Sequence, residues 1–216
     1  MASERLVSTV PQMDSELHAL MEAGDFDALE PYNLRKREAN RGAISECSHA
    51  VHTWDELLRL TKILPGRNEL PALLFDLWGG WWFADNPDAL APAIEDAWSS
   101  SELPLNAAAA DEWLELFEEA GFINNTVSDE TARPREAMTT HRGATPETAA
   151  RMSWTDRLET ARWFAGRFGG VLGRKVWSAH VEPSRLLAHF HDDDDDPREW
   201  EWVVDPRALT VEEYSP

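Results

Sequence analysis

Apolar residues recur every three or four positions through the first 120 residues, and this spacing predicts amphipathic helices. The clearest helix is Asn106–Ala120, in which the apolar side chains share one side and Gly121 follows the last turn. Further helices are predicted over Met13–Gly24, from the Thr53 capping box to Pro65, over Pro71–Phe83, and from Asn86 to Trp98. Three tryptophans of one segment either fill a helical core or line a ligand groove: Trp78, Trp81 and Trp82.

The pattern changes at Ala137 to short runs rich in β-branched and aromatic residues. Strands are predicted over Met138–His141, Lys175–Val181, Leu186–Phe190, Trp200–Val204 and Leu209–Val211, with one helix over Asp156–Phe168. Residues 122–136 hold few apolar side chains and are expected to form a linker. The predicted fold is therefore α+β: an all-helical region over 1–121, followed by a small mixed β-sheet domain over 137–216.

Composition narrows the function classes. The 216 residues contain 40 acidic and 20 basic side chains, for a net charge of −20. Nucleic acids and anionic membranes attract clustered Lys and Arg, so neither is expected as a direct partner. The eleven tryptophans indicate a substantial core or a binding surface.

Cys47 is the only cysteine, which excludes an intrachain disulfide and a cysteine-rich zinc site. The polar, acidic start lacks the basic and apolar regions of a signal peptide. The most apolar stretch, Leu70–Ala84, is interrupted by Asp76 and two glycines. We therefore expect a soluble cytoplasmic protein, although delivery by a signal-independent route stays open, as does the oligomeric state.

Three local features of the second half carry candidate chemistry. His141-Arg142-Gly143 ends the first predicted strand, and Ser153-Trp154-Thr155 precedes the predicted helix. Glu199-Trp200-Glu201 then leads into the apolar run Trp202-Val203-Val204. Positions i and i+2 of a strand share a face, so the two carboxylates point the same way if the strand begins by Glu199.

In this order, the three features resemble the arginine-serine-glutamate branch of the ADP-ribosyltransferases, over about residues 137–211. That branch carries an Arg on its first strand, a Ser-Thr-Ser stretch, and Gln/Glu-x-Glu on a loop entering another strand. The sequence departs from this pattern where His141 replaces an aromatic residue and Trp154 replaces the middle Thr. The resemblance implies an ADP-ribosyltransferase-like sheet and NAD as a substrate.

The resemblance also implies roles. Glu201 would stabilise the positive charge that develops on the ribose, and Glu199 would align or deprotonate the acceptor. Arg142 and Gly143 would hold the cofactor's phosphates, to which a guanidinium fork is suited. Ser153, Trp154 and Thr155 would support Glu201 or the nicotinamide ribose. No residue is assigned to a metal.

Structural roles are also consistent with these residues. Arg142 could form an ion pair at a strand end, and His141 could serve packing or hydrogen bonding. Ser153 is a good helix N-cap, with Asp156 three residues on. Glu199 and Glu201 could be solvated residues on a strand face.

The run Asp192–Asp196 follows two histidines, His189 and His191. It lacks the Gly turn and distal Glu of a calcium loop, and five adjacent carboxylates favour an exposed loop. Its charge could attract a basic acceptor such as an Arg-rich protein surface.

These observations predict a mono-ADP-ribosyltransferase that moves ADP-ribose from NAD to a macromolecule, with protein, and Arg in particular, as the expected acceptor. Three alternatives stay open: an NAD glycohydrolase with water as the acceptor, a degenerate NAD binder, and an acidic inhibitor protein that mimics nucleic acid.

Overall fold

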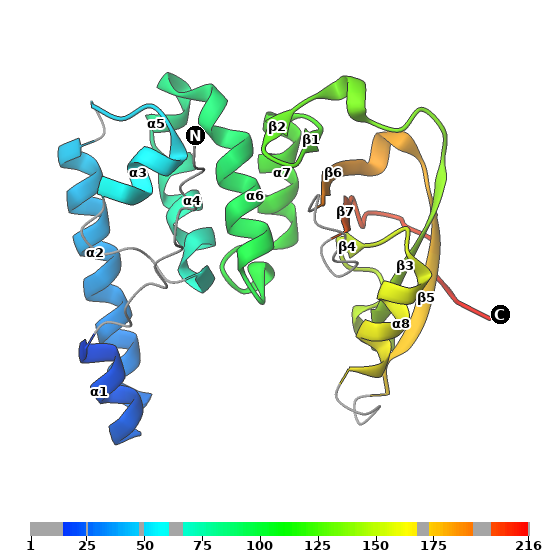
Figure 1. Cartoon of the computed structure of the whole chain (residues 1–216), viewed down its shortest axis with the longest axis horizontal. Helices are drawn as coiled ribbons and strands as arrows, with labels where there is room; N and C mark the ends of the chain where they lie inside the picture. The colour runs from blue at the N-terminus through cyan, green and yellow to red at the C-terminus, as the bar shows by residue number, and fades with distance from the viewer. Residues whose placement is uncertain are drawn as a thin grey trace, which may run out of the picture.

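Helices occupy the first half of the chain and strands the second, so the protein has the predicted α+β class (Figure 1). The computed structural model describes residues 15–24, 26–47, 50–60, 67–167, 173–191 and 200–215. Within these ranges, every helix is too short or too polar to span a bilayer.

In the described residues, seven α-helices precede the first strand: α1 (Ser15–Ala23), α2 (Leu29–Cys47), α3 (Trp54–Leu60), α4 (Leu70–Trp78), α5 (Trp82–Asp85), α6 (Leu90–Ser100) and α7 (Ala110–Ala120). Every predicted N-terminal helix is present in whole or in part. Gly24 follows α1 with φ +65°, which a glycine adopts without strain. The segment predicted as Pro71–Phe83 is split into α4 and α5 around Gly79-Gly80.

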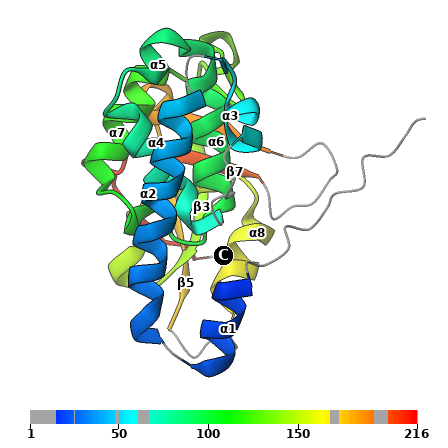
Figure 2. The same cartoon turned by 90° about the vertical axis from the view of Figure 1, so that its left-hand side faces the viewer.

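Helix α2 was not predicted from the sequence. Its 19 residues, LEPYNLRKREANRGAISEC, are dominated by charged and polar side chains, and no apolar stripe repeats along them. Charged helices of this kind lack the periodic signal that identifies an amphipathic helix. Helices α1 and α2 lie at the end of the molecule farthest from the strands (Figure 1), and this end faces the viewer in Figure 2.

The part of the C-terminal half that the structure describes contains eight strands and α8 (Leu158–Gly166). The first sheet has the order β2-β1-β6-β7-β4, and the second has the order β3-β5-β8. The strand bounds are β1 Ile123–Asn124, β2 Val127–Ser128, β3 Met138–Ala144, β4 Ser153–Trp154, β5 Lys175–Val181, β6 Leu186–Phe190, β7 Glu201–Val204 and β8 Glu212–Glu213. Strand β1 runs parallel to β6 and the other pairs are antiparallel, so the first sheet is mixed.

The predicted strands β5 and β6 have the expected bounds, whereas β8 lies just beyond Leu209–Val211. The segment 122–136, predicted as a linker, contributes β1 and β2 to the first sheet, and beyond Ile123 its side chains are half-buried or exposed. Ile123 pairs with Ala188 of β6, and both Phe122 and Ile123 are fully buried. Two-residue strands such as β1 and β2 are too short for an alternating pattern to show.

Two hydrogen bonds join the sheets edge to edge. The His141 N–H donates to the Thr155 carbonyl at 2.6 Å, and the Thr155 N–H donates to the His141 carbonyl at 2.9 Å. His141 belongs to β3, and Thr155 directly follows β4. The strands that carry the three sequence features, β3, β4 and β7, are therefore consecutive neighbours across the junction.

The first sheet is buried on both faces. One face packs on the helical region, and its Ile123, Ala188 and Val203 share a core with α4, α6 and α7. The other face supplies Trp202 and Val204 to a smaller core shared with β5 of the second sheet. Side chains alternate along β7, so Glu201 lies on the same face as Val203, toward the helices.

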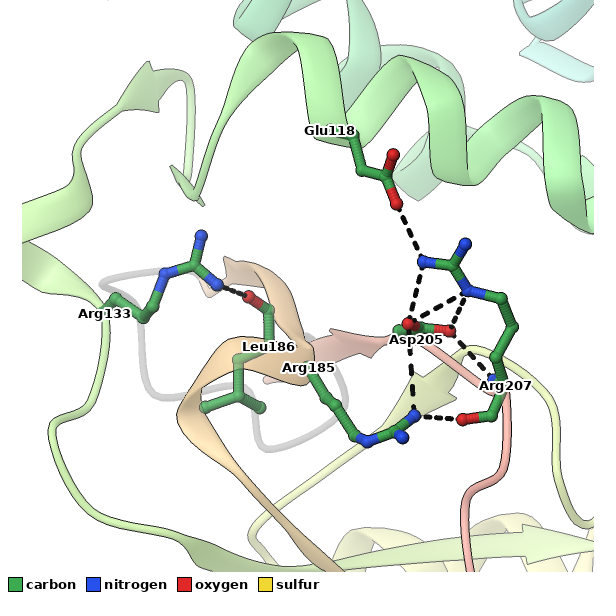
Figure 3. A network of polar contacts seen from close by, with 6 residues as sticks. All are labelled: Glu118, Arg133, Arg185, Leu186, Asp205 and Arg207. Carbon is green, nitrogen blue, oxygen red and sulfur yellow. Dashed lines mark hydrogen bonds and ion pairs between the residues drawn. The ribbon is translucent and has the colours of Figure 1, made fainter.

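A polar network fastens α7 to the chain that leaves β7 (Figure 3). The Arg207 guanidinium donates to Glu118 of α7 at 2.7 Å and to Asp205 at 3.0 Å. Arg185 donates to the Arg207 carbonyl, and Arg133 donates to the Leu186 carbonyl. The network lies past the Val204 end of β7, so it supports the fold without joining the residues around Glu201.

Helix α8 packs directly on β3 at Gly143. A Cβ atom on Gly143 would lie 2.3 Å from the Ala161 carbonyl oxygen and 2.4 Å from the Ala165 nitrogen. Backbone atoms of a helix cannot move aside as a flexible side chain can. Glycine is therefore required here for the close approach of helix to strand, whatever else the position does.

We expect Gly143→Ala to lower the free energy of unfolding by about 1–3 kcal/mol, the usual cost of overpacking. Gly166→Ala, in α8, is the matched control, because a Cβ at Gly166 meets nothing within 4 Å. Urea unfolding of both variants checks the prediction. A Gly143→Ala protein as stable as Gly166→Ala would contradict it.

Candidate functional site

A pocket of about 310 Å³ opens between β3, β4, α8 and the start of β7. Its lining includes every predicted site residue within the described part of the chain: Arg142, Gly143, Ser153, Trp154, Thr155 and Glu201, together with His141. Glu199, the other predicted catalytic residue, lies outside the described residues, as does Asp192–Asp196. The structure therefore brings three sequence-distant features to one cavity.

Arg142 is held in the wall of this pocket by two carbonyl groups. Its Nε donates to the Thr148 carbonyl at 3.1 Å, and its Nη1 donates to the Ser153 carbonyl. Burial lowers the pKa of Arg142 to about 10, although the Glu201 carboxylate acts in the opposite direction. The guanidinium of the half-buried Arg142 thus remains a cation at neutral pH.

Ser153 belongs to strand β4, so its interpretation as a helix N-cap is wrong. Helix α8 begins only at Leu158, and Arg157 occupies the N-cap position without a side-chain cap. The Ser153 side chain instead lies beside the Glu201 carboxylate and lowers its pKa. Pairing of β4 with β7 places Ser153 opposite Val203, beside Glu201.

Glu201 is the first residue of β7, and it is half-buried on the side of the sheet that faces the helical region. The indole Nε1 of Trp98, in α6, donates to Glu201 Oε1 at 2.8 Å. Burial raises the pKa of Glu201, and the contacts with Trp98, Ser153 and Arg142 oppose that rise without cancelling it. Glu201 is therefore not a solvated residue on a strand face.

The remaining predicted site residues have structural contacts. Trp154 is buried in the smaller core, and its indole donates to the Arg151 carbonyl at 2.6 Å, so we assign it a packing role. Thr155 joins the two sheets, and its hydroxyl accepts a bond from the Arg157 N–H at 3.2 Å. His141 Nδ1 lies 2.8 Å from the Ser178 hydroxyl, and burial lowers the pKa of His141.

Sequence reasoning missed the helical side of the site. A second cavity of about 260 Å³ shares Arg142, Ser153 and Glu201 with the first. Its other wall comes from the end of α6 and the following loop, including Trp98, Ser101 and Glu102. No local pattern marks these residues, because they meet Glu201 only through packing between regions about 100 residues apart.

Basic side chains gather at the first pocket despite the acidic composition. Four arginines line it: Arg142, Arg151, Arg167 and Arg174. The carboxylates in the lining are Glu102 and Glu201. Neighbouring positive charges repel, and Arg151 and Arg174 both lower the pKa of Arg142. Such a cluster is suited to an anionic ligand, whose phosphates would relieve that repulsion.

The other sequence candidates do not join this pocket. Trp82 is buried in the helical core, whereas Trp81 is 49% exposed. His189 stacks on Trp202 with the ring centroids 3.8 Å apart, and burial lowers the pKa of His189 to about 4. Across the part of the chain that the structure describes, no cluster of three His, Cys, Asp or Glu residues is arranged to hold a metal.

The arrangement combines a half-buried carboxylate, a tryptophan that donates to it, a serine beside it, and four arginines in the lining of the same pocket. A carboxylate in this setting can stabilise a cationic centre, and the arginines can bind phosphate. Comparison of the chain with protein-family models, curated proteins and solved structures found no match.

We expect Glu201→Gln to raise the melting temperature at pH 7. The pKa of Glu201 is raised in the folded protein, so folding favours its neutral form and the ionised carboxylate costs stability above the unfolded-state pKa. The neutral amide removes this cost. The gain should shrink as the pH falls and wild-type Glu201 becomes protonated.

Thermal unfolding at several pH values between 4 and 8 measures this difference. Glu115→Gln, the same change on an exposed carboxylate of α7, is the control and should leave the melting temperature nearly unchanged. A Glu201→Gln protein less stable than wild type at pH 7 would show that the carboxylate is a net stabilising group.

Proposed function

We propose that the protein is a mono-ADP-ribosyltransferase that uses NAD and transfers ADP-ribose to a protein acceptor. The observation that carries the proposal is the convergence of Arg142, Ser153 and Glu201 in one pocket. Each comes from a different strand, and each contacts or electrostatically influences another: Arg142 donates to Ser153, and both act on Glu201. Chance resemblance of three short motifs would not require this proximity.

The charge distribution supports a dinucleotide as the substrate. The chain has a net charge of −20, yet four arginines line the pocket that holds Glu201. Arginine pairs with phosphate through a planar fork of N–H groups. Arg142 has its Nε and Nη1 committed to carbonyls, so its orientation is fixed before any ligand binds. The N–H groups that remain on this fixed guanidinium can therefore bind an anion with little reorganisation.

The reaction would break the bond between nicotinamide and ribose, and the electron pair of that bond would leave with nicotinamide. Glu201 would remain ionised beside the ribose and stabilise the positive charge that develops there. Ser153 would hold the carboxylate in place. Glu199 would accept the proton that the acceptor loses when it forms its new bond to the ribose carbon.

Protein is the proposed acceptor, and arginine the proposed acceptor residue. The Glu-x-Glu pattern resembles the members of the branch that modify arginine, and the acidic run that precedes it would attract a basic surface. Hydrolysis of NAD by water uses the same first step. The identity of the acceptor therefore separates the two activities, whereas cleavage of NAD does not.

The test of the proposed function uses NAD labelled on its adenylate half, incubated with a lysate. We expect wild type to label macromolecules, and Glu201→Gln to lose on the order of 10²-fold or more in rate, the usual cost of removing a group that stabilises transition-state charge. Glu115→Gln serves as the folded control with an equal change of charge. Equal labelling by wild type and Glu201→Gln would contradict the proposal.

Glu199 should separate transfer from hydrolysis. Glu199→Gln removes the proposed acceptor base but leaves Glu201 intact, so we expect transfer to be lost while hydrolysis of NAD persists. Released nicotinamide and labelled protein are measured in parallel. Equal loss of both products would mean that Glu199 acts in NAD cleavage. Free ADP-ribose as the sole wild-type product would identify a glycohydrolase.

A further inference from the structure

A residue of the helical region donates a hydrogen bond to the Glu201 carboxylate. Trp98, in α6, donates its indole N–H to Glu201 Oε1 at 2.8 Å, across 103 residues of sequence. The tryptophan is 4% exposed, so water does not compete with this bond from its side. Hydrogen bonds to a charged group are stronger than neutral ones, and more so where water is excluded.

The indole has little freedom to move. Its ring meets Trp113 edge to face at a centroid distance of 5.0 Å and meets Phe117 at 5.5 Å. Both partners belong to α7 and are almost fully buried. Packing between α6 and α7 therefore sets the direction of the indole N–H.

The strand meets this donor because of its register. Glu201 and Val203 share the face of β7 that packs on the helical region, and Val203 is fully buried in the core that includes Trp98. Burial of Val203 against the helices thus brings Glu201 to the end of α6. A slip by one residue would turn Glu201 toward the second sheet.

We propose that Trp98 is a positioning residue for Glu201, so that the helical region completes the active site. The inference rests on the proposed function. It assigns a role in the chemistry to the helical half of the chain, whose Glu102 and Leu103 also line the first pocket. Trp98 acts through Glu201 and holds one of its oxygens, while Ser153 lies beside the carboxylate from β4.

The indole has an electrostatic effect as well as a geometric one. Its N–H favours the ionised carboxylate and opposes the effect of burial on the pKa of Glu201. Arg142 from β3 acts in the same direction, and Arg151, Arg174 and Glu102 also line the cavities around it. Loss of the indole donor should therefore raise the pKa of Glu201 further, and the enzyme should lose activity at a higher pH on the acidic side.

The test compares Trp98→Phe with Trp54→Phe. Phenylalanine keeps an aromatic ring in the core and removes the N–H. Trp54 is the matched control, because it is similarly buried and its indole donates to Asp96 of α6 at 2.7 Å. Trp54 lines neither of the two cavities around Glu201. Both variants lose an indole bond to a carboxylate of the fold, but only one of those carboxylates is Glu201.

We expect Trp98→Phe to lower kcat about tenfold or more, the effect of losing a hydrogen bond to a charged group, and to move the acidic limb of the pH profile to higher pH. Trp54→Phe should stay within about twofold of wild type, with an unchanged profile. NAD turnover with unchanged kcat and pH profile in Trp98→Phe would overturn the role of Trp98 and leave the proposed function standing.

A second measurement does not depend on activity. The indole N–H resonance of Trp98 is identified by its absence from the Trp98→Phe spectrum. We expect it to shift in Glu201→Gln and not in Glu115→Gln. No response to Glu201→Gln would overturn the inference. If the Trp98 resonance shifts in Glu201→Gln but the wild-type protein does not turn over NAD, the contact is supported and the proposed reaction is overturned.

Discussion

The junction between His141 and Thr155 is the constraint on which the site depends. Its two backbone hydrogen bonds join the sheets at one point and set β3 beside β4. Arg142, the next residue along β3, can then reach the Ser153 carbonyl. Gly143 follows, and its missing side chain lets α8 close one side of the pocket. Arg142 and Glu201 belong to different sheets, and the junction is what brings those sheets together.

The site holds ionisable groups where burial makes their ionisation unfavourable. Burial lowers the pKa of Arg142 and raises that of Glu201, so each group is less easily ionised than in water. Perturbed groups of this kind cluster at functional sites, because a charge that costs stability can be retained for its chemistry. The chain carries a large acidic excess, and yet four arginines line the pocket that holds this carboxylate.

The helical and strand regions are joined through packing as well as through the polar network at Glu118 and Arg207. The larger core contains side chains from α4, α6 and α7 together with Ile123, Ala188 and Val203 of the first sheet. An independent strand domain would expose that face of its sheet. The helices therefore complete the core of the strand region, and one of them also supplies the donor to Glu201.

Sequence patterns determined the class of the fold and the identity of most elements, because side-chain periodicity reflects which face of an element is buried. Strands β5 and β6 were located with their bounds for this reason, and α7 nearly so. Helix α2 was missed because its charged sequence carries no such period. Strands β1, β2 and β4 were missed because two residues cannot display one.

By itself, the sequence also determined which residues to propose for the chemistry: an arginine, a serine and a glutamate in a recognisable order. Only the tertiary structure decided that Ser153 is a strand residue beside Glu201 and not a helix cap, since local sequence suits both positions. It also decided that Glu201 faces the helical region, because the face of β7 is chosen by packing on the helices. The contact with Trp98 depends on that packing alone: two residues 103 positions apart share no local pattern that could reveal it.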